Sequence, residues 1–169
     1  MPPIHHTVAN MSESDAEQAI ETLQERLVAT LDLQLTLKHV HWNVVGMNFI
    51  AVHEMIDPQV DEVRLMSDAL AERIATLGGA PQGTPGAIER IRTWDDYSID
   101  RANTVEHLRA LDAVYDGVVG DHRNAQKVLA DLDPVSEDMI IGQLGQLELF
   151  QWFLRSHLMD GSGTVSGGS

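Results

Sequence analysis

The chain of 169 residues has no cysteine and very little fixed positive charge. Without cysteine it can form no disulfide, no thiolate metal site and no cysteine nucleophile. It carries 11 lysine and arginine residues against 26 aspartate and glutamate residues, and only Lys38 and Lys127 are lysines. A phosphate-binding surface depends on clustered lysine and arginine, so this composition disfavours direct nucleic-acid binding near neutral pH. The formal net charge of −15 favours cations instead.

Long apolar runs are also missing. No stretch approaches the roughly 18 unbroken apolar residues of a membrane span. Residues 1–15 have neither the basic start nor the apolar core of a secretory signal, so we expect a cytoplasmic protein. The length and the hydrophobic fraction of 43% suit one globular domain. We place that domain at 14–159, with an N-terminal tail at 1–13 and a flexible, Gly- and Ser-rich tail at 160–169.

Hydrophobic periodicity predicts four long helices and no strand. Ser14 followed by Glu17 is a capping-box pattern, which predicts that the first helix starts there and runs to about Val44. Its apolar residues form two stripes on opposite sides. We therefore expect this helix to be buried twice, once in its own bundle and once against a neighbouring chain.

The other three long helices are predicted at about 48–77, 101–131 and 134–159, the last one capped by Asp133 with Pro134 at its first position. Between the second and third lies a crossover of about 23 residues, rich in Gly and Pro, with a short helix near 87–92. A crossover of this length lets the second and third long helices run parallel. The predicted fold is an all-α, ferritin-like four-helix bundle.

Four ionisable residues on the second helix have a spacing that indicates a metal site. His53, Asp57, Asp68 and Glu72 fall at roughly 0°, 40°, 60° and 100° around an ideal helix, so they share one face. Asp57 and Asp68 are nevertheless about 16 Å apart along the axis, whereas ligands of one ion must approach it to about 2–2.6 Å. A two-fold axis near residues 62 and 63 would place the His53 end of one chain opposite the Glu72 end of another. The spacing therefore predicts metal sites shared by two chains, with a buried polar interface as the alternative.

A further histidine, His41, lies at the end of the first helix and can reach the same cluster across a short turn. Histidine and carboxylate without sulfur form a ligand set for iron, manganese or zinc.

Several sequence segments together resemble one family closely. They are HVHWNVVG at 39–46, NF at 48–49, HEMID at 53–57, AER at 71–73 before the glycines at 78–79, and FQWF at 150–153. Both the residue types and the spacings resemble the Dps-type mini-ferritins, the starvation-induced relatives of ferritin, over roughly residues 23–158. The Glu-x-x-His pairs of a single-bundle di-iron ferritin are absent.

This resemblance implies a hollow homododecamer of tetrahedral symmetry, built from two-fold dimers that carry ferroxidase centres at their interfaces. It implies that His41, His53 and Asp57 come from one subunit, and Asp68 and Glu72 from its mate. The implied cofactor and substrate is iron. Fe(II) would be oxidised, preferentially by hydrogen peroxide, and ferric mineral would be stored in the cavity.

The resemblance implies two further groups of residues. Trp42 is similar to the family's redox-active tryptophan, with a packing anchor at the interface between chains as the alternative role. Acidic pores on the three-fold axes would admit iron, and the matching positions are Asp133, Glu137 and Asp138. Asp133 has a compatible second role as a helix cap.

The chain departs from the family in one respect, because it has no lysine-rich tail of the kind used for DNA binding. The resemblance therefore implies iron oxidation and storage without DNA binding. A nucleoid-condensing stress protein is the first alternative function. A metal-dependent hydrolase is the second, although no substrate pocket is evident. His5 and His6 could bind an additional metal, but exposed terminal histidines usually bind none.

Overall fold

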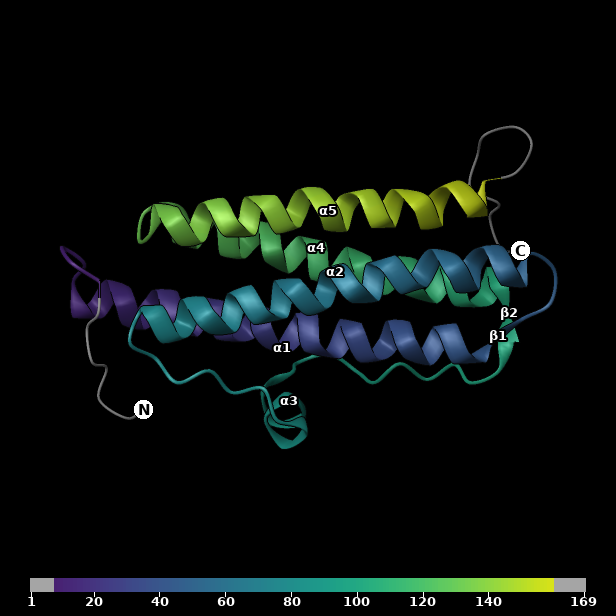
Figure 1. The fold of residues 1–169 in the computed structure, drawn as a ribbon, viewed down its shortest axis with the longest axis horizontal. Helices are drawn as coiled ribbons and strands as arrows, with labels where there is room; N and C mark the ends of the chain where they lie inside the picture. Colours follow the sequence, from purple (N-terminus) through teal and green to yellow (C-terminus); the bar gives the residue numbers. More distant parts are fainter. Residues whose placement is uncertain (1–7, 160–169) are drawn as a thin grey trace.

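A computed structural model describes residues 8–159 of the chain, and its four long helices lie side by side as a bundle (Figure 1). The elements in chain order are α1 (Glu13–Asn43), β1 (Val44–Val45), α2 (Phe49–Thr76), α3 (Pro85–Ile91), β2 (Ala102–Asn103), α4 (Thr104–Ala130) and α5 (Pro134–Leu158). Figure 1 shows that α1 and α5 run in one direction while α2 and α4 run in the other. The predicted ferritin-like bundle with a short helix in its crossover is confirmed.

The helix starts follow local capping chemistry. α5 begins as predicted, with Pro134 in its first turn and the Asp133 carboxylate accepting the Ser136 backbone N–H. α1 begins earlier than predicted, because Ser12 and not Ser14 caps it. The Ser12 hydroxyl accepts the Asp15 backbone N–H at 3.1 Å, which places Ser14 inside the first turn.

The prediction of no strand is wrong in one detail. β1 and β2 form a two-stranded parallel sheet in which Val44 pairs with Ala102 and Val45 with Asn103. Two-residue strands leave no alternation in the sequence, so periodicity could not reveal them. The Thr104 hydroxyl also donates to the Met47 carbonyl at 3.1 Å. The end of the crossover is thus fastened to the turn between α1 and α2.

Both apolar stripes of α1 are buried within the chain itself, contrary to our expectation. Leu33 and Leu37 face the bundle core, and Ile20 on the other stripe is also buried. Ile20 is covered because Gly79, just after α2, lets the backbone approach it closely. A Cβ on Gly79 would lie 3.0 Å from the Ile20 Cγ2. The large apolar residues of α1 that are left outside are Leu35 and Trp42, with 60% and 71% of their surfaces exposed.

Within the described residues, no helix carries an apolar stretch long enough to cross a lipid bilayer.

Candidate metal centre

The two histidines of the predicted site lie against each other at one end of the bundle. His41 is in the last turn of α1 and His53 is near the start of α2. The connecting turn is tight because Gly46 and Asn48 adopt left-handed backbone conformations, with φ of 92° and 63°. The two imidazole rings are stacked, with centroids 3.6 Å apart and planes inclined by 22°. His41 is buried, whereas His53 is half-buried.

Each histidine is oriented by the backbone of the other. The Nδ1 of His41 is 3.0 Å from the carbonyl oxygen of His53, and the Nδ1 of His53 is 2.9 Å from the carbonyl oxygen of His41. A carbonyl can only accept, so each Nδ1 carries the proton and donates it. This tautomer leaves the lone pair on both Nε2 atoms, which is the arrangement of a metal-binding histidine held by a second hydrogen bond.

Asp57 completes this cluster and is paired with a lysine. Its Oδ1 lies 3.2 Å from the His41 Nδ1 and 3.0 Å from the Lys38 Nζ. The hydrogen bond from Lys38, with the nearby histidines, holds the pKa of Asp57 below its ordinary value. The carboxylate is therefore ionised at neutral pH, and an incoming cation must compete with the Lys38 ammonium. Sequence reasoning missed Lys38, although its position three residues before His41 places it on the same side of the helix.

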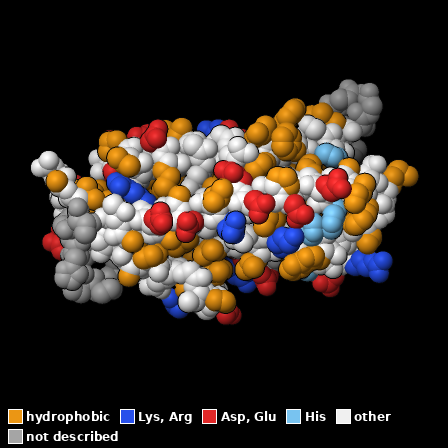
Figure 2. All heavy atoms as spheres, in the orientation of Figure 1, with side chains coloured by type: hydrophobic (Ala, Val, Ile, Leu, Met, Phe, Trp, Pro, Cys, Tyr) orange, Lys and Arg blue, Asp and Glu red, His pale blue; other side chains and the backbone are white. Residues whose placement is uncertain are grey.

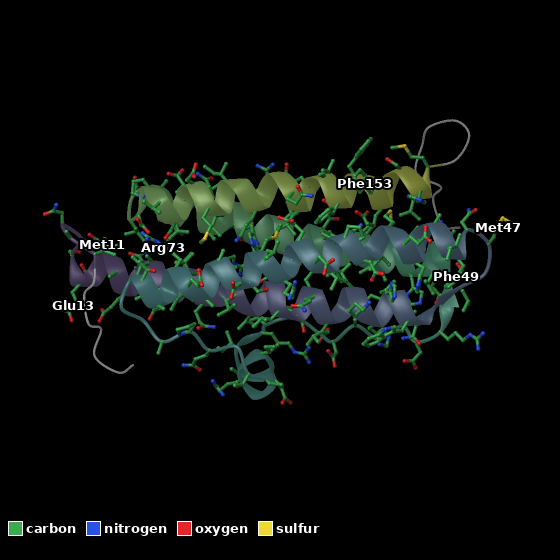
Figure 3. The ribbon with its side chains drawn as sticks, viewed as in Figure 1. Met11, Glu13, Met47, Phe49, Arg73 and Phe153 are labelled. Atoms are coloured by element: carbon green, nitrogen blue, oxygen red, sulfur yellow. The ribbon has the colours of Figure 1, made fainter. Side chains whose placement is uncertain are left out.

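The second half of the predicted ligand set lies elsewhere on α2. Asp68 and Glu72 are exposed, and neither side chain has a hydrogen bond or ion pair among the described residues. Phe49 and Arg73, which mark the two ends of α2, lie towards opposite ends of the bundle (Figure 3). Within residues 8–159 of one chain, no three His, Asp or Glu side chains are arranged to hold a metal ion. The predicted ligand set is thus divided between two separate places on one chain.

The face that carries these predicted ligands is both acidic and apolar. Figure 2 shows carboxylates distributed along α2, with histidine gathered near one end of it. The large apolar side chains exposed around α2 and the end of α1 are Leu35, Trp42, Met47, Phe49, Ile50 and Leu65. Trp42 is 71% exposed, and the Lys38 ammonium lies 5.7 Å from the centre of its ring. Trp42 thus packs little within one chain, and the exposed apolar area is typical of a surface that binds a partner.

The three residues assigned to an acidic pore differ in environment. Asp133 is buried, and its Oδ2 pairs with the Arg73 NH2 at 2.6 Å. Glu137 is half-buried and accepts the Gln126 amide N–H at 2.7 Å. Asp138 is exposed, so it is the carboxylate most available to an ion in solvent.

Among the described residues, the middle of the bundle holds no cluster of His, Asp or Glu side chains that could bind a metal ion. His122 is fully buried between the Val118 carbonyl and the Gln143 side chain. Burial, with a contribution from the Arg26 charge, lowers the pKa of His122 to about 4. Nearby, the Tyr115 hydroxyl donates to the Gln59 side-chain oxygen at 2.7 Å. The histidine and carboxylate groups of the predicted site thus lie on α2 and at the end of α1.

Comparison with known proteins identifies the family of this chain. The ferritin-like domain family matches residues 20–163. The DNA protection during starvation protein of Mycolicibacterium smegmatis is 55% identical over 160 residues, which cover 95% of this chain and 87% of that protein. The chain belongs to the Dps-type mini-ferritins. Among solved structures, the tetragonal form of Mycobacterium smegmatis Dps superposes with a TM-score of 0.95 at 53% identity, over 98% of this chain and 100% of that one. DpsA14 from Streptomyces coelicolor superposes with a TM-score of 0.94 at 56% identity, over 97% and 98% of the two chains.

In this Dps-type mini-ferritin, the predicted ligands are divided between two places on one chain. The described part of the bundle has no cluster of His, Asp or Glu side chains that could hold a metal ion, and Asp57, Asp68 and Glu72 lie exposed on its surface. No place in the described part of one chain brings all five predicted ligands together.

Proposed function

We propose that this mini-ferritin is a ferroxidase and an iron-storage and detoxification cage that protects against oxidative stress. The observation that carries the proposal is the orientation of His41 and His53, whose Nδ1 atoms are both occupied by backbone carbonyls while both Nε2 atoms are left for a metal. Asp57 is ionised beside them. Two oriented histidines and an ionised carboxylate, without further ligands in their own chain, are suited to a metal ion that is shared with a partner chain.

In the proposed dimer, the partner supplies the missing carboxylates. A second chain related by a two-fold axis near the middle of α2 would bring its Asp68 and Glu72 to the His41, His53 and Asp57 of the first. The interface is isologous, so every dimer would have two such sites. The exposed apolar residues around α2 would be buried at the same time, which provides the favourable free energy of association.

The donor set suits the oxidation of iron. Carboxylates favour the harder Fe(III), whereas imidazole helps to hold Fe(II) before it reacts. Two Fe(II) ions, one hydrogen peroxide and two waters would give two FeO(OH) units and four protons, so each iron loses one electron and both peroxide oxygens are reduced. Delivering both electrons together avoids the release of hydroxyl radical. Trp42, beside His41 in the sequence, would be a redox-active neighbour of the site.

The proposed assembly is a homododecamer with a hollow interior for ferric mineral. Twelve chains with a formal charge of −15 each would carry about −180, which attracts cations strongly at low salt. Asp138, with Glu137 nearby, would line the pores that admit iron. Asp133 would contribute mainly as the cap that shapes the start of α5, since its carboxylate is already paired with Arg73. We expect the cage to act in the cytoplasm.

Iron oxidation and core formation test this function directly. Added Fe(II) should be oxidised faster with hydrogen peroxide than with dioxygen, as followed by ferric absorbance. Electron microscopy should then show an electron-dense core inside a closed shell. Oxidation no faster than in protein-free buffer, or ferric precipitate outside the shell, would reject the proposal.

DNA condensation is the alternative function, and the positions of the basic residues argue against it. All 11 lysine and arginine residues lie within the described residues, and at least six of them are paired with carboxylates of the same chain. We expect no gel shift of duplex DNA at neutral pH and 150 mM salt without Mg²⁺. Replacing exposed Asp or Glu residues by neutral ones should increase DNA binding only weakly. Tight, salt-sensitive binding of the unmodified protein would show that the charge argument is wrong.

A further inference from the structure

An open hollow lies beside Trp94, where α1 and α4 meet the crossover between α3 and β2. Its volume is about 280 Å³. The Trp94 indole Nε1 donates to the Asp32 Oδ2 at 2.7 Å, which holds this part of the crossover against α1. Apart from carboxylates, α1 and α4 contribute only apolar residues and one glycine to the lining of this Trp94 hollow: Ala29, Leu33, Ala113, Val114, Gly117 and Val118.

The hollow exists because two residues of α4 are small. Ala113 and Gly117 are four residues apart, so they lie on the same face of the helix. A Cβ built on Gly117 meets no described atom within 4 Å. The described chain thus leaves the space over Gly117 open, and a larger side chain at this one position would fill it.

Carboxylates from three different elements line the Trp94 hollow, and they are not fully neutralised. They are Asp32 of α1, Asp95 of the crossover and Asp121 of α4. Asp95 is exposed, and its side chain has no hydrogen bond or ion pair among the described residues. The Asp121 Oδ2 lies 3.6 Å from the Arg26 NH1, which is longer than a hydrogen bond. Both Asp95 and Asp121 therefore keep oxygen lone pairs for a ligand.

The wider surroundings of the Trp94 hollow are also acidic. Glu25 lies 3.9 Å from the Arg26 NH2, and Arg92 pairs with both Asp32 and Asp96. Five carboxylates are thus set against two guanidinium groups, which leaves a local formal charge of −3. Such a surface attracts cations and repels anionic ligands.

The Trp94 hollow stays open in the proposed dimer. Around an ideal helix, Ala29 and Leu33 lie about 180–240° from Leu35 and Trp42, the exposed apolar residues of α1 that a partner would cover. The hollow is therefore on the other side of α1 from the proposed contact between two chains. A ligand bound there does not compete with the dimer partner.

The combination of an apolar lining and an acidic rim favours one kind of cation. Mg²⁺ and Ca²⁺ are bound by oxygen ligands and retained water, and a lining of methyl groups and indole supplies neither. An alkylammonium ion instead places its methylene groups against apolar surface while its charged end stays near carboxylates and water. Because the carboxylates come from three elements around the hollow, they suit a chain that carries more than one ammonium group.

We propose that the Trp94 hollow binds a free linear aliphatic polyamine, with one molecule in each subunit. The methylene chain lies over the apolar residues of α1 and α4, and the ammonium groups pair with Asp32, Asp95 and Asp121. Binding is noncovalent and needs no iron, so the inference is independent of the proposed ferroxidase function. Because the ligand joins α1, the crossover and α4 in the folded chain only, it should also raise the Tm of the iron-free assembly.

Calorimetric titration of the iron-free assembly tests the class of ligand. At pH 7 and 150 mM NaCl, spermidine should bind saturably at one molecule per subunit. 1,4-Diaminobutane should bind more weakly because it has one ammonium group fewer, and 1,4-butanediol, of the same length but uncharged, should not bind. An equal concentration of Mg²⁺ should not displace bound spermidine. Saturable binding of the diol, or displacement by Mg²⁺, would show that the ligand class is wrong.

Gly117→Leu tests the place of binding, because it fills the hollow without changing the charge of the protein. This variant should lose the saturable binding of spermidine, and it should stay folded because leucine has a higher helix propensity than glycine. The matched control is Gly120→Leu, since Gly120 lies on the same helix but outside the lining of the hollow. It should bind spermidine like the unmodified protein. Undiminished binding in Gly117→Leu would show that spermidine is only a general counterion, and would overturn the proposal.

Asp95→Asn tests the contribution of the rim. It should weaken spermidine binding by up to about 5-fold, which is the scale of one partly exposed ion pair. Glu17→Gln removes an exposed carboxylate of α1 outside the hollow and should leave the affinity unchanged. Equal weakening in the two variants would mean that only the total charge matters, and would contradict a defined site.

A basic peptide is the competing occupant. Tri-lysine carries its ammonium groups on a bulkier backbone, so it should bind more weakly than spermidine. Tighter binding of tri-lysine would assign the hollow to a protein segment and reject the polyamine. A crystal structure of the assembly with spermidine should show the amine between Trp94 and α4. Spermidine bound elsewhere, with the Trp94 hollow empty, would also reject the proposal.

Discussion

Co-assembly of two inactive variants should restore about one quarter of the ferroxidase sites, because each proposed site takes its ligands from two chains related by a two-fold axis. One variant is His53→Ala with Asp57→Ala, and the other is Asp68→Ala with Glu72→Ala. Either variant alone lacks two of the five proposed ligands at every site. The rate of Fe(II) oxidation by either variant should fall by about 100-fold or more. Loss of groups that only hold metal ligands in place already lowers metal affinity or activity by about 10–100-fold.

The recovery follows from how the two variants pair. When equal amounts are mixed before assembly, about half of the dimers contain one chain of each kind under random pairing. Each mixed dimer has one site with all its ligands and one site lacking all four substituted groups. The measurement is the initial rate of Fe(II) oxidation by peroxide, with mass spectrometry to show that mixed shells have formed.

The matched control removes carboxylates from α2 outside the proposed site. Glu54→Ala with Glu62→Ala changes the charge of the helix by the same amount as Asp68→Ala with Glu72→Ala, and it should oxidise iron at the unmodified rate. Mixed shells without recovered activity would contradict the sharing of sites between chains. Undiminished oxidation in either parent variant would reject the ligand assignment itself.

Of the single substitutions proposed for this protein, Arg73→Met should lower the free energy of unfolding most, because it leaves the buried carboxylate of Asp133 without its cation. Arg73 bridges α2 and α5 through its NH2 and Nε atoms, which lie 2.6 Å and 3.2 Å from the Asp133 Oδ2, and its Nε also donates to the Ser136 hydroxyl. Breaking a buried ion pair on one side costs about 3–5 kcal/mol. For a chain of this size that corresponds to a decrease of roughly 10 °C in Tm, measured by calorimetry at equal subunit concentration.

Two further variants test the cause of that loss. Arg90→Met removes an exposed arginine whose partners are the Gln82 side chain and the Gly86 carbonyl, and it should change stability by no more than about 0.5 kcal/mol. Adding Asp133→Asn to Arg73→Met should recover part of the stability, since the neutral amide still accepts the Ser136 N–H. An unchanged Tm in Arg73→Met, or a further decrease in the double variant, would contradict the buried-charge explanation.

Acidic pH should weaken the ion pair between Arg73 and Asp133. Burial alone would raise the pKa of Asp133, but hydrogen bonds from Ser136 and Arg73 outweigh it, and the net pKa lies below the ordinary value. The unfolded chain therefore binds a proton to Asp133 before the folded one does. The contribution of Asp133 to the free energy of unfolding is complete above the pKa of about 4 that this carboxyl has in the unfolded chain. It is lost as the pH falls through the pKa of Asp133 in the folded chain.

Much of the fold was predictable from local patterns. The Asp133–Pro134 start of α5, the extent of α2 and the glycine-rich end of that helix all depend on interactions within a few residues, and the structure agrees with them. The start of α1 was misplaced because two serines, Ser12 and Ser14, offer nearly equivalent caps to the same turn. The β1–β2 pairing was invisible because it joins segments nearly 60 residues apart with only two residues on each side.

Some features of the candidate site were predictable from the sequence and others were not. The common face of His53, Asp57, Asp68 and Glu72 and the distance between its two halves follow from helix geometry, so spacing alone predicted that one chain could not complete a site. The mutual hydrogen bonds of His41 and His53, the pairing of Lys38 with Asp57, and the pairing of Arg73 with Asp133 did not follow from it. Each of these contacts joins residues of two different elements.

By itself the sequence determined the helices, the direction of their crossover and the side of α2 that carries ionisable groups, since each of these depends on the regular advance of a helix and on caps a few residues away. Tertiary structure decided which nitrogen each histidine leaves free and which carboxylates are already neutralised. Such properties depend on atoms brought within about 3 Å by packing, a distance that no periodicity along the chain specifies.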